Sequence, residues 1–116
     1  MKSRILVCGG RNYYDRVVFN NAMGHALQWF GFTYCIIEGD ATGADALAKE
    51  WGRSQGVPVI TMAANWTMYS KTAGSVRNSW MLEWAKPDLI IAFPGGAGTA
   101  NMVRIAKEAG VDVWCP

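Results

Sequence analysis

The chain is short of charge, of cysteine and of histidine, and each shortage excludes a class of protein. Charged residues make up 17% of the 116 residues and hydrophobic ones 51%, which excludes a disordered segment and predicts a folded globular domain. The net charge is only +2 and lysines and arginines form no cluster, which argues against a nucleic-acid partner. The single histidine, His25, lies far from any cysteine, so we expect no metal site.

The three cysteines are too few and too widely spaced for a disulfide framework. Cys8, Cys35 and Cys115 are an odd number and fall mostly in apolar, strand-like runs, so we expect buried thiols in a reducing compartment. No apolar run reaches the roughly twenty residues of a membrane span, and no signal-peptide pattern is visible. We therefore expect a cytoplasmic protein with no membrane partner, built as one domain over residues 1–116.

Predicted strands and helices alternate along the chain. Apolar runs predict strands at Arg4–Cys8, Thr33–Ile37, Val57–Thr61, Leu89–Phe93 and Val111–Trp114. Helical periodicity predicts helices at Asp15–Phe30, Thr42–Ser54 with Thr42 as N-cap, Gly74–Ala85 and Thr99–Ala109, with Met62–Ala73 irregular. In the first helix the predicted apolar face holds Val18, Phe19, Ala22, Met23, Ala26, Leu27 and Phe30. The alternation predicts an α/β fold: a single Rossmann-like domain with about five parallel strands and helices on both faces.

The segment from Pro87 to Met102 is the most informative, because a buried strand runs into a glycine-rich turn and then a helix. The glycines at 95, 96 and 98 allow left-handed angles and close approach of the backbone to a ligand, and Thr99 can cap the helix. Free N–H groups and the positive helix end then predict a phosphate site. The alternative is an ordinary tight turn. A Walker A lysine and a complete dinucleotide fingerprint are both missing.

Glycine and polar residues follow the first four predicted strands at their carboxyl ends, which form the edge where parallel sheets bind ligands. In chain order they are Gly9, Gly10 and Arg11; Gly39, Asp40, Gly43 and Asp45; Asn65 and Trp66; and Gly95, Gly96, Gly98 and Thr99. A random distribution of loop residues would rarely produce this coincidence. It predicts a binding site at the carboxyl edge of the sheet.

Two kinds of charged side chain at this edge allow two interpretations. Arg11 can grip a phosphate through its planar guanidinium, or it forms an ion pair with Asp15 or Asp40. Asp40 and Asp45 can accept hydrogen bonds from ribose hydroxyls, or they serve as capping and first-turn acids around Thr42. The sequence leaves both alternatives open.

Four tryptophan and tyrosine positions also have two interpretations. Trp66 and Tyr69 can stack on a base, or they anchor the loop by filling a gap in the core. Trp80 and Trp84 lie one helical turn apart and share a face, which becomes an interface if the domain itself leaves it uncovered. We expect a homo-oligomer, most simply a two-fold dimer, formed through that face.

Four motifs carry a resemblance to a known family. They are CGGRNYYD from Cys8, EGDATGADALAKEW from Glu38, NWTMYSKTAGSVRNSWM from Asn65 and the turn PGGAGT from Pro94. In this order they resemble the YspA-like branch of the SLOG superfamily, a Rossmann-like group that includes the "lonely guy" phosphoribohydrolases and the Smf/DprA DNA-processing proteins. Arg77 and Asn78 match the RN of this pattern, and the resemblance implies that Arg77 stands where the phosphoribohydrolases have their active-site arginine. A solvated helix face is the alternative for this pair.

One position departs from the phosphoribohydrolases. Their turn continues as PGGxGTxxE, and the resemblance places Met102 where they carry the glutamate. A thioether can neither transfer a proton nor stabilise an oxocarbenium ion, so cleavage through that position is excluded. Glu38 and Glu83 remain as substitutes, but no sequence feature brings either to a sugar.

The sequence therefore favours a binding protein without catalytic residues or cofactors. Its expected partner is a small nucleotide derivative or an ADP-ribose-like signalling nucleotide, which the protein senses or sequesters. The alternative is a nucleotide hydrolase related to the phosphoribohydrolases that uses an unrecognised carboxylate. Binding of single-stranded DNA, as in the DNA-processing relatives, is disfavoured by the low charge.

Overall fold

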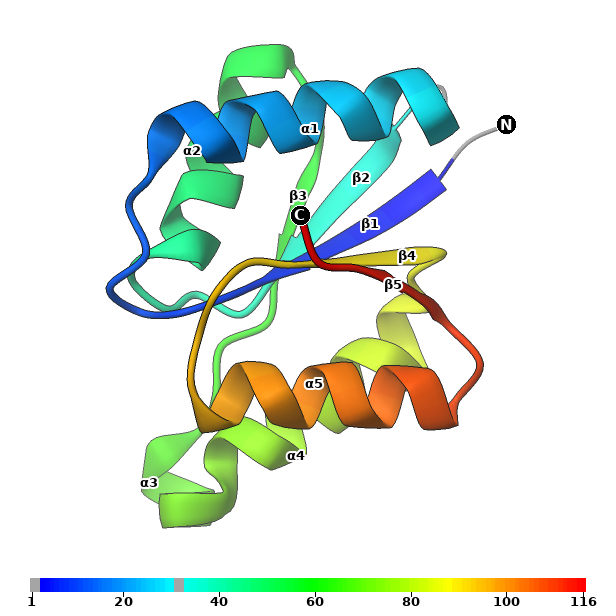
Figure 1. Cartoon of the computed structure of the whole chain (residues 1–116). Coiled ribbons are helices and arrows are strands. Elements are labelled where there is room, and N and C mark those ends of the chain that lie inside the picture. Colours follow the sequence, from blue (N-terminus) through cyan, green and yellow to red (C-terminus); the bar gives the residue numbers. More distant parts are fainter. Residues whose placement is uncertain (1–2, 31–32) are drawn as a thin grey trace.

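A five-stranded parallel sheet forms the centre of the molecule (Figure 1). The computed structural model describes residues 3–30 and 33–116. Its strands are β1 Ser3–Cys8, β2 Thr33–Glu38, β3 Val59–Thr61, β4 Leu89–Ala92 and β5 Asp112–Trp114. They lie in the order β3, β2, β1, β4, β5, so the direction of strand addition reverses between β1 and β4. This arrangement confirms the predicted α/β, Rossmann-like fold.

Helices cover both faces of the sheet, as Figure 1 shows. On one face lie α1 (Arg16–Phe30) and α2 (Ala44–Gln55). On the other lie α4 (Ala73–Trp80), its π-helical continuation η2 (Met81–Ala85) and α5 (Ala97–Glu108). None of the helices in the described parts of the chain is both long and apolar enough to cross a membrane.

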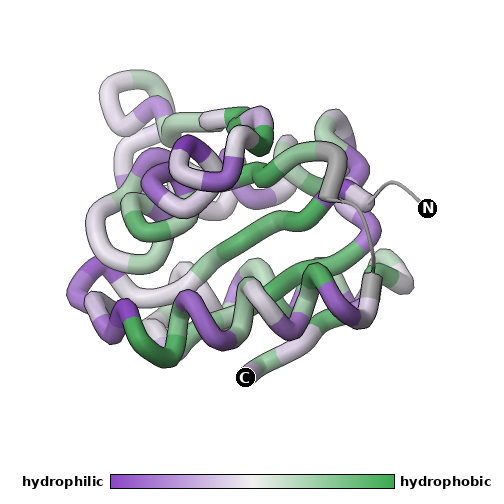
Figure 2. The backbone as a smooth tube through the Cα atoms, turned by 90° about the horizontal axis from the view of Figure 1, so that it is seen from above, coloured by the Kyte–Doolittle hydropathy of each residue, from purple (hydrophilic) through white to green (hydrophobic). Residues whose placement is uncertain are grey.

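The core has two halves, one on each side of the sheet. Alternate residues of β1 point to opposite faces: Ile5 and Val7 pack with α1 and α2, whereas Leu6 and Cys8 belong to the cluster under α4 and α5. Because both faces are covered, the strands read as continuous apolar runs in the sequence. Figure 2 shows hydrophobic residues along the strands in the middle and hydrophilic residues recurring along the helices outside them.

Both helices that follow a glycine-rich turn begin differently from the prediction. Thr42 is not the N-cap of α2; that position belongs to Gly43 at φ 74°, and a Cβ there would collide with the Gly10 carbonyl. The Thr42 hydroxyl donates instead to the carbonyl of Arg11, 2.9 Å away. Thr99 is not a cap either, because α5 begins at Ala97 with no side-chain cap. Backbone geometry, and not a hydroxyl, starts each helix.

The segment predicted as irregular, Met62–Ala73, is largely helical. It contains α3 (Trp66–Tyr69) and the 3-10 turn η1 (Ser70–Thr72), which runs into α4. The side chain of Asn65 caps α3 by accepting a hydrogen bond from the Met68 amide at 2.9 Å. One turn of helix is too short to produce an apolar period, which explains the wrong prediction.

Three further predictions need correction. Val18 is 43% exposed, because the side of α1 that meets the core is narrower than the apolar pattern. It is formed by the buried Phe19, Ala22, Met23 and Ala26 with the partly buried Leu27, and the side chain of Phe30 lies outside what the structure describes. The third strand begins at Val59, since the Val57 amide donates to the Gly52 carbonyl at the end of α2. Cys8 and Cys35 are buried as expected, but Cys115 follows the edge strand β5 and is exposed.

Candidate functional site

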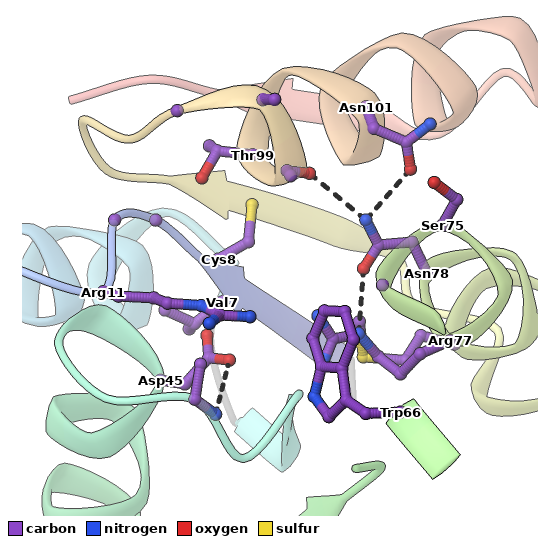
Figure 3. Close-up of a pocket in the computed structure, with 18 of the residues that line it drawn as sticks. Val7, Cys8, Arg11, Asp45, Trp66, Ser75, Arg77, Asn78, Thr99 and Asn101 are labelled. Atoms are coloured by element: carbon purple, nitrogen blue, oxygen red, sulfur yellow. Dashed lines mark hydrogen bonds between the residues drawn. The ribbon is translucent and has the colours of Figure 1, made fainter. Parts of the chain in front are cut away.

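A cavity of about 500 Å³ opens where β1 and β4 end, at the reversal of the strand order. Its volume lies within the range of small-molecule sites, and its position is the one at which open α/β sheets bind ligands. Figure 3 shows it bounded by the end of β1, the loop before α2, α3, α4 and the start of α5. Ten of the fourteen predicted site residues line it: Gly9, Gly10, Arg11, Asp45, Trp66, Arg77, Asn78, Gly96, Gly98 and Thr99.

The other four predicted residues do not line this cavity. A Cβ on Gly43 would collide with the Gly10 carbonyl, and one on Gly95 would collide with the Thr99 hydroxyl, so these two glycines let neighbouring turns pack closely. The carboxylate of Asp40 pairs with Lys49 Nζ at 2.8 Å. Together with Gly39, Asp40 lines a smaller neighbouring cavity.

The fold brings to the cavity several side chains that the sequence did not indicate as binding residues, among them Cys8, Lys71, Ser75 and Asn101. Ser75 and Asn101 each lie three residues from a predicted site residue on the same helix, at positions 78 and 98, and residues so spaced share a helix face. That spacing was an available signal. Lys71 lies in η1, where no periodic pattern could have indicated its direction.

The glycine-rich turn presents an open helix end to the cavity. The predicted left-handed angles are wrong: among the described glycines, those with positive φ are 43, 56 and 110. Gly96 adopts φ −97° and precedes the first residue of α5. A Cβ at Gly96 or Gly98 would meet nothing within 4 Å, so the backbone there faces open space. The first amides of a helix have no partner within it, and they are free to receive an anion.

Asp45 is a buried carboxyl on the opposite wall of the cavity. Its Oδ2 accepts hydrogen bonds from the amides of Gly39 and Ala41, both at 3.2 Å, which fixes the loop after β2. Burial raises its pKa from 3.8 to about 6, although the Ala41 amide and the charge of Arg77 act in the opposite direction. No side chain caps α2, so the capping part of the second interpretation is wrong, but Asp45 does lie in the first turn of the helix. The same carboxyl also lines the cavity.

Arg77 and Asn78 form a hydrogen-bonded bridge and not a solvated helix face. Arg77 Nη1 donates to the Gly39 carbonyl at 2.5 Å, and Nε donates to Asn78 Oδ1 at 3.0 Å. Asn78 Nδ2 donates onward to the carbonyl of Gly98 at 3.2 Å and to Asn101 Oδ1 at 3.0 Å (Figure 3). Burial lowers the pKa of Arg77 below its ordinary value, but a guanidinium stays cationic at neutral pH.

Arg11 and Trp66 face each other across the cavity in Figure 3. The guanidinium carbon lies 5.3 Å from the centre of the indole, a cation–π distance, and Trp66 is 49% exposed. Trp66 therefore does not fill a gap in the core. The predicted partners of Arg11 are otherwise engaged, since Asp40 pairs with Lys49 and Asp15 accepts a hydrogen bond from the Val18 amide at the start of α1.

The remaining aromatic residues lie away from the cavity. Tyr69 packs edge-on against Trp80 with ring centres 5.6 Å apart, so it is not placed to stack on a base there. Trp80 and Trp84 stack at 5.1 Å with 10° between their planes, which agrees with the shared face predicted from their spacing. Trp80 is half-buried and Trp84 is 60% exposed, so the described parts of the chain cover this face only in part.

The carboxylates considered for catalysis do not line the cavity. Met102 is fully buried in the core half under α4 and α5. Glu38 is also fully buried, where it accepts hydrogen bonds from the Thr61 hydroxyl and from the Asp40 amide at 2.7 Å. Glu83 is exposed on η2. Among the residues described, Asp45 is the carboxyl that lines the cavity.

Comparison with known proteins gives two matches. The model of the family described as YAcAr, the YspA, cpYpsA-related SLOG family, matches residues 3–69, which is more than half of the chain. The chain is also similar to "Gene 61 protein" of Mycobacterium phage D29, with 33% identity over 117 residues that cover 95% of this chain and 93% of that protein. No solved structure matches.

Proposed function

The chain belongs to the YspA, cpYpsA-related SLOG family, and from this premise we propose that it binds a nucleotide or an ADP-ribose-like nucleotide and does not cleave it. Membership of this family suggests a nucleotide-related function. The observation that carries the proposal is the open start of α5, which faces the same cavity as Arg11 and Arg77. Amide groups and guanidinium ions on facing walls favour a phosphate between them.

Each remaining part of a nucleotide has a matching group on the wall. Asp45 presents a carboxyl that can accept a hydrogen bond from a ribose hydroxyl, and Trp66 presents a half-exposed indole on which a base can stack. Thr99 adds a hydroxyl in the first turn of α5. The walls of the cavity thus carry cationic, polar and aromatic groups.

Binding without cleavage is the better proposal because of what stands at position 102. A fully buried methionine replaces the glutamate that the related phosphoribohydrolases use, and neither Glu38 nor Glu83 lines the cavity. A domain of this kind can sense a nucleotide or hold it out of solution. Both roles require the binding site and neither requires a catalytic acid.

Mass spectrometry of small molecules released by heating the purified protein tests the proposal. We expect a phosphate-containing nucleotide from the unmodified protein and little or none from Gly96→Leu, whose side chain would occupy the open space before α5. Gly24→Leu is the matched control, since Gly24 lies in α1 away from the cavity and a Cβ there also meets nothing within 4 Å. Equal recovery from Gly96→Leu and the control would refute this placement of the site.

One observation supports hydrolysis as a second candidate. Asp45 faces the cavity and has a pKa of about 6 because of its burial, close to the value that suits a general acid or base near neutral pH. We expect no release of ribose 5-phosphate or free base from nucleoside monophosphates in overnight incubations analysed by chromatography. Turnover that disappears in Asp45→Asn would instead favour the hydrolase.

A further inference from the structure

A second, smaller cavity of about 350 Å³ lies beside the first. The loop after β2 forms one of its walls with Gly39, Asp40 and Thr42, and Ala63 and Ala64, which precede α3, form another. The residues that line both cavities are Arg11, Ala41, Trp66 and Arg77. The two spaces are therefore neighbours that share a wall.

The shared wall includes a contact between two separate parts of the fold. Arg11 comes from the loop after β1 and Trp66 from α3, and the guanidinium lies over the indole at 5.3 Å. Both side chains are exposed, and no salt bridge of Arg11 is found within residues 3–30 and 33–116. A cation–π contact at an exposed site is weak, so a ligand that offers the guanidinium a phosphate can displace it from the indole.

The smaller cavity adds no cation to the two that it shares with the larger one. The cations Arg11 and Arg77 stand on the shared wall, whereas the smaller cavity adds the carboxylate of Asp40, the hydroxyl of Thr42 and the apolar side chains of Ala63 and Ala64. The Asp40 carboxylate pairs with Lys49 through Oδ1, and its oxygens can still accept hydrogen bonds from sugar hydroxyls. The smaller cavity thus suits an uncharged sugar and ring, and the shared wall suits the anionic group that precedes them.

We propose that the smaller cavity is a second subsite, and that the ligand has two ring-bearing halves joined by phosphate groups that cross the wall formed by Arg11, Trp66 and Arg77. This inference rests on the proposed function, which requires only the larger cavity. It gives a binding role to Gly39 and Asp40, which line the smaller cavity and not the larger one. A mononucleotide would occupy the larger cavity alone.

Calorimetric titration with adenosine monophosphate, ADP-ribose and diadenosine diphosphate separates these cases. We expect at least one of the two double-ring probes to bind about tenfold or more tightly than the mononucleotide. Ala64→Phe fills the smaller cavity and should remove that advantage while the affinity for the mononucleotide changes less than about twofold. Ala63→Phe, at an exposed position of the same wall, is a second variant in case Ala64→Phe does not fold.

Ala109→Phe is the control for these variants. It places the same side chain at the far end of α5, outside both cavities, and should leave all three affinities unchanged. If the mononucleotide binds and neither double-ring probe binds more tightly, or if both phenylalanine variants leave the advantage intact, the second subsite is refuted and the proposed function stands. If none of the three probes binds, the proposed function fails with it.

Discussion

Asn78 donates a hydrogen bond from Nδ2 to the carbonyl oxygen of Gly98, 3.2 Å away, and thereby ties α4 to the first turn of α5. The same side chain accepts a hydrogen bond from Arg77 Nε at 3.0 Å and is only 4% exposed. One amide group therefore sets the position of a cationic side chain relative to the open helix end. Because an Asn side chain both donates and accepts, no acid or alkyl group can replace it here.

Replacing Asn78 tests this bridge. We expect Asn78→Ala to lower the free energy of unfolding by about 1–3 kcal/mol, because it removes buried hydrogen bonds and leaves their partners unpaired. Urea denaturation measures the change. Ser79→Ala, at an exposed position of the same helix, is the control and should lie within about 0.5 kcal/mol of the unmodified protein. Equal stabilities of the two variants would contradict the role given to Asn78.

Adjacent glycines of the turn should respond differently to alanine. A Cβ at Gly95 would collide with the Thr99 hydroxyl and lie 2.6 Å from the Gly10 amide, so Gly95→Ala should cost about 1–3 kcal/mol of stability. A Cβ at Gly96 meets nothing within 4 Å, and Gly96→Ala should change stability by less than about 0.5 kcal/mol. Thermal denaturation of both variants measures the difference, and the reverse order of stabilities would contradict the packing of this turn.

Arg77 should contribute to ligand affinity through its charge and its fixed orientation. We expect Arg77→Ala to weaken binding of ADP-ribose by about 1.5–3 kcal/mol, the scale of a hydrogen bond to a charged group. Arg77→Lys keeps the charge but replaces the planar guanidinium, which donates from Nη1 to the Gly39 carbonyl and from Nε to Asn78, by a single ammonium nitrogen, so it should restore only part of the affinity. Calorimetry measures the affinity of each variant, with Arg53→Ala on α2 as the control. Full recovery of the affinity in Arg77→Lys would show that only the charge of this side chain matters.

The buried carboxyl of Asp45 should make stability depend on pH. Burial raises its folded-state pKa to about 6 from an ordinary value of 3.8, so the folded protein holds this proton more tightly than the unfolded chain. The free energy of unfolding should therefore fall as the pH rises from about 4 to about 6. Asp45→Asn lacks this titration and should be more stable than the unmodified protein by up to about 3 kcal/mol at pH 8. If the free energies of unfolding of the two proteins changed in parallel with pH, Asp45 would not be the source of the pH dependence.

The stacked pair Trp80 and Trp84 should mark an interface between two copies of the chain. Trp84 is 60% exposed, and large aromatic side chains left at a surface are typical anchors of protein interfaces. We expect light scattering at micromolar concentration to give at least twice 12.7 kDa, and Trp84→Asp to give the monomer. Trp29→Asp, at an exposed tryptophan on α1, is the control. A monomeric mass for the unmodified protein would refute the interface.

The sequence by itself determined the architecture and the edge at which the cavity lies. Runs such as Leu89–Phe93 are apolar throughout because a parallel sheet covered on both faces offers no polar side, and their alternation with helical patterns leaves few other arrangements. The glycines after β1 and β4 were recognisable because they cluster directly after predicted strands, and at Gly9, Gly10 and Gly95 the close packing of the two turns leaves no room for a Cβ. These signals are local, or repeat along the chain, so they can be read without coordinates.

Only the tertiary structure decided which side chains share a cavity. Thr42 and Thr99 look like helix caps, yet Gly43 and Gly96 hold those positions. At Gly43 the reason is the close approach of the Gly10 carbonyl, which leaves no room for a Cβ. Asp40 and Asp45 were equivalent in the sequence, but the loop after β2 points one toward Lys49 and buries the other. Such outcomes depend on contacts between residues far apart in the chain, and no local pattern records the direction in which a loop places its side chains.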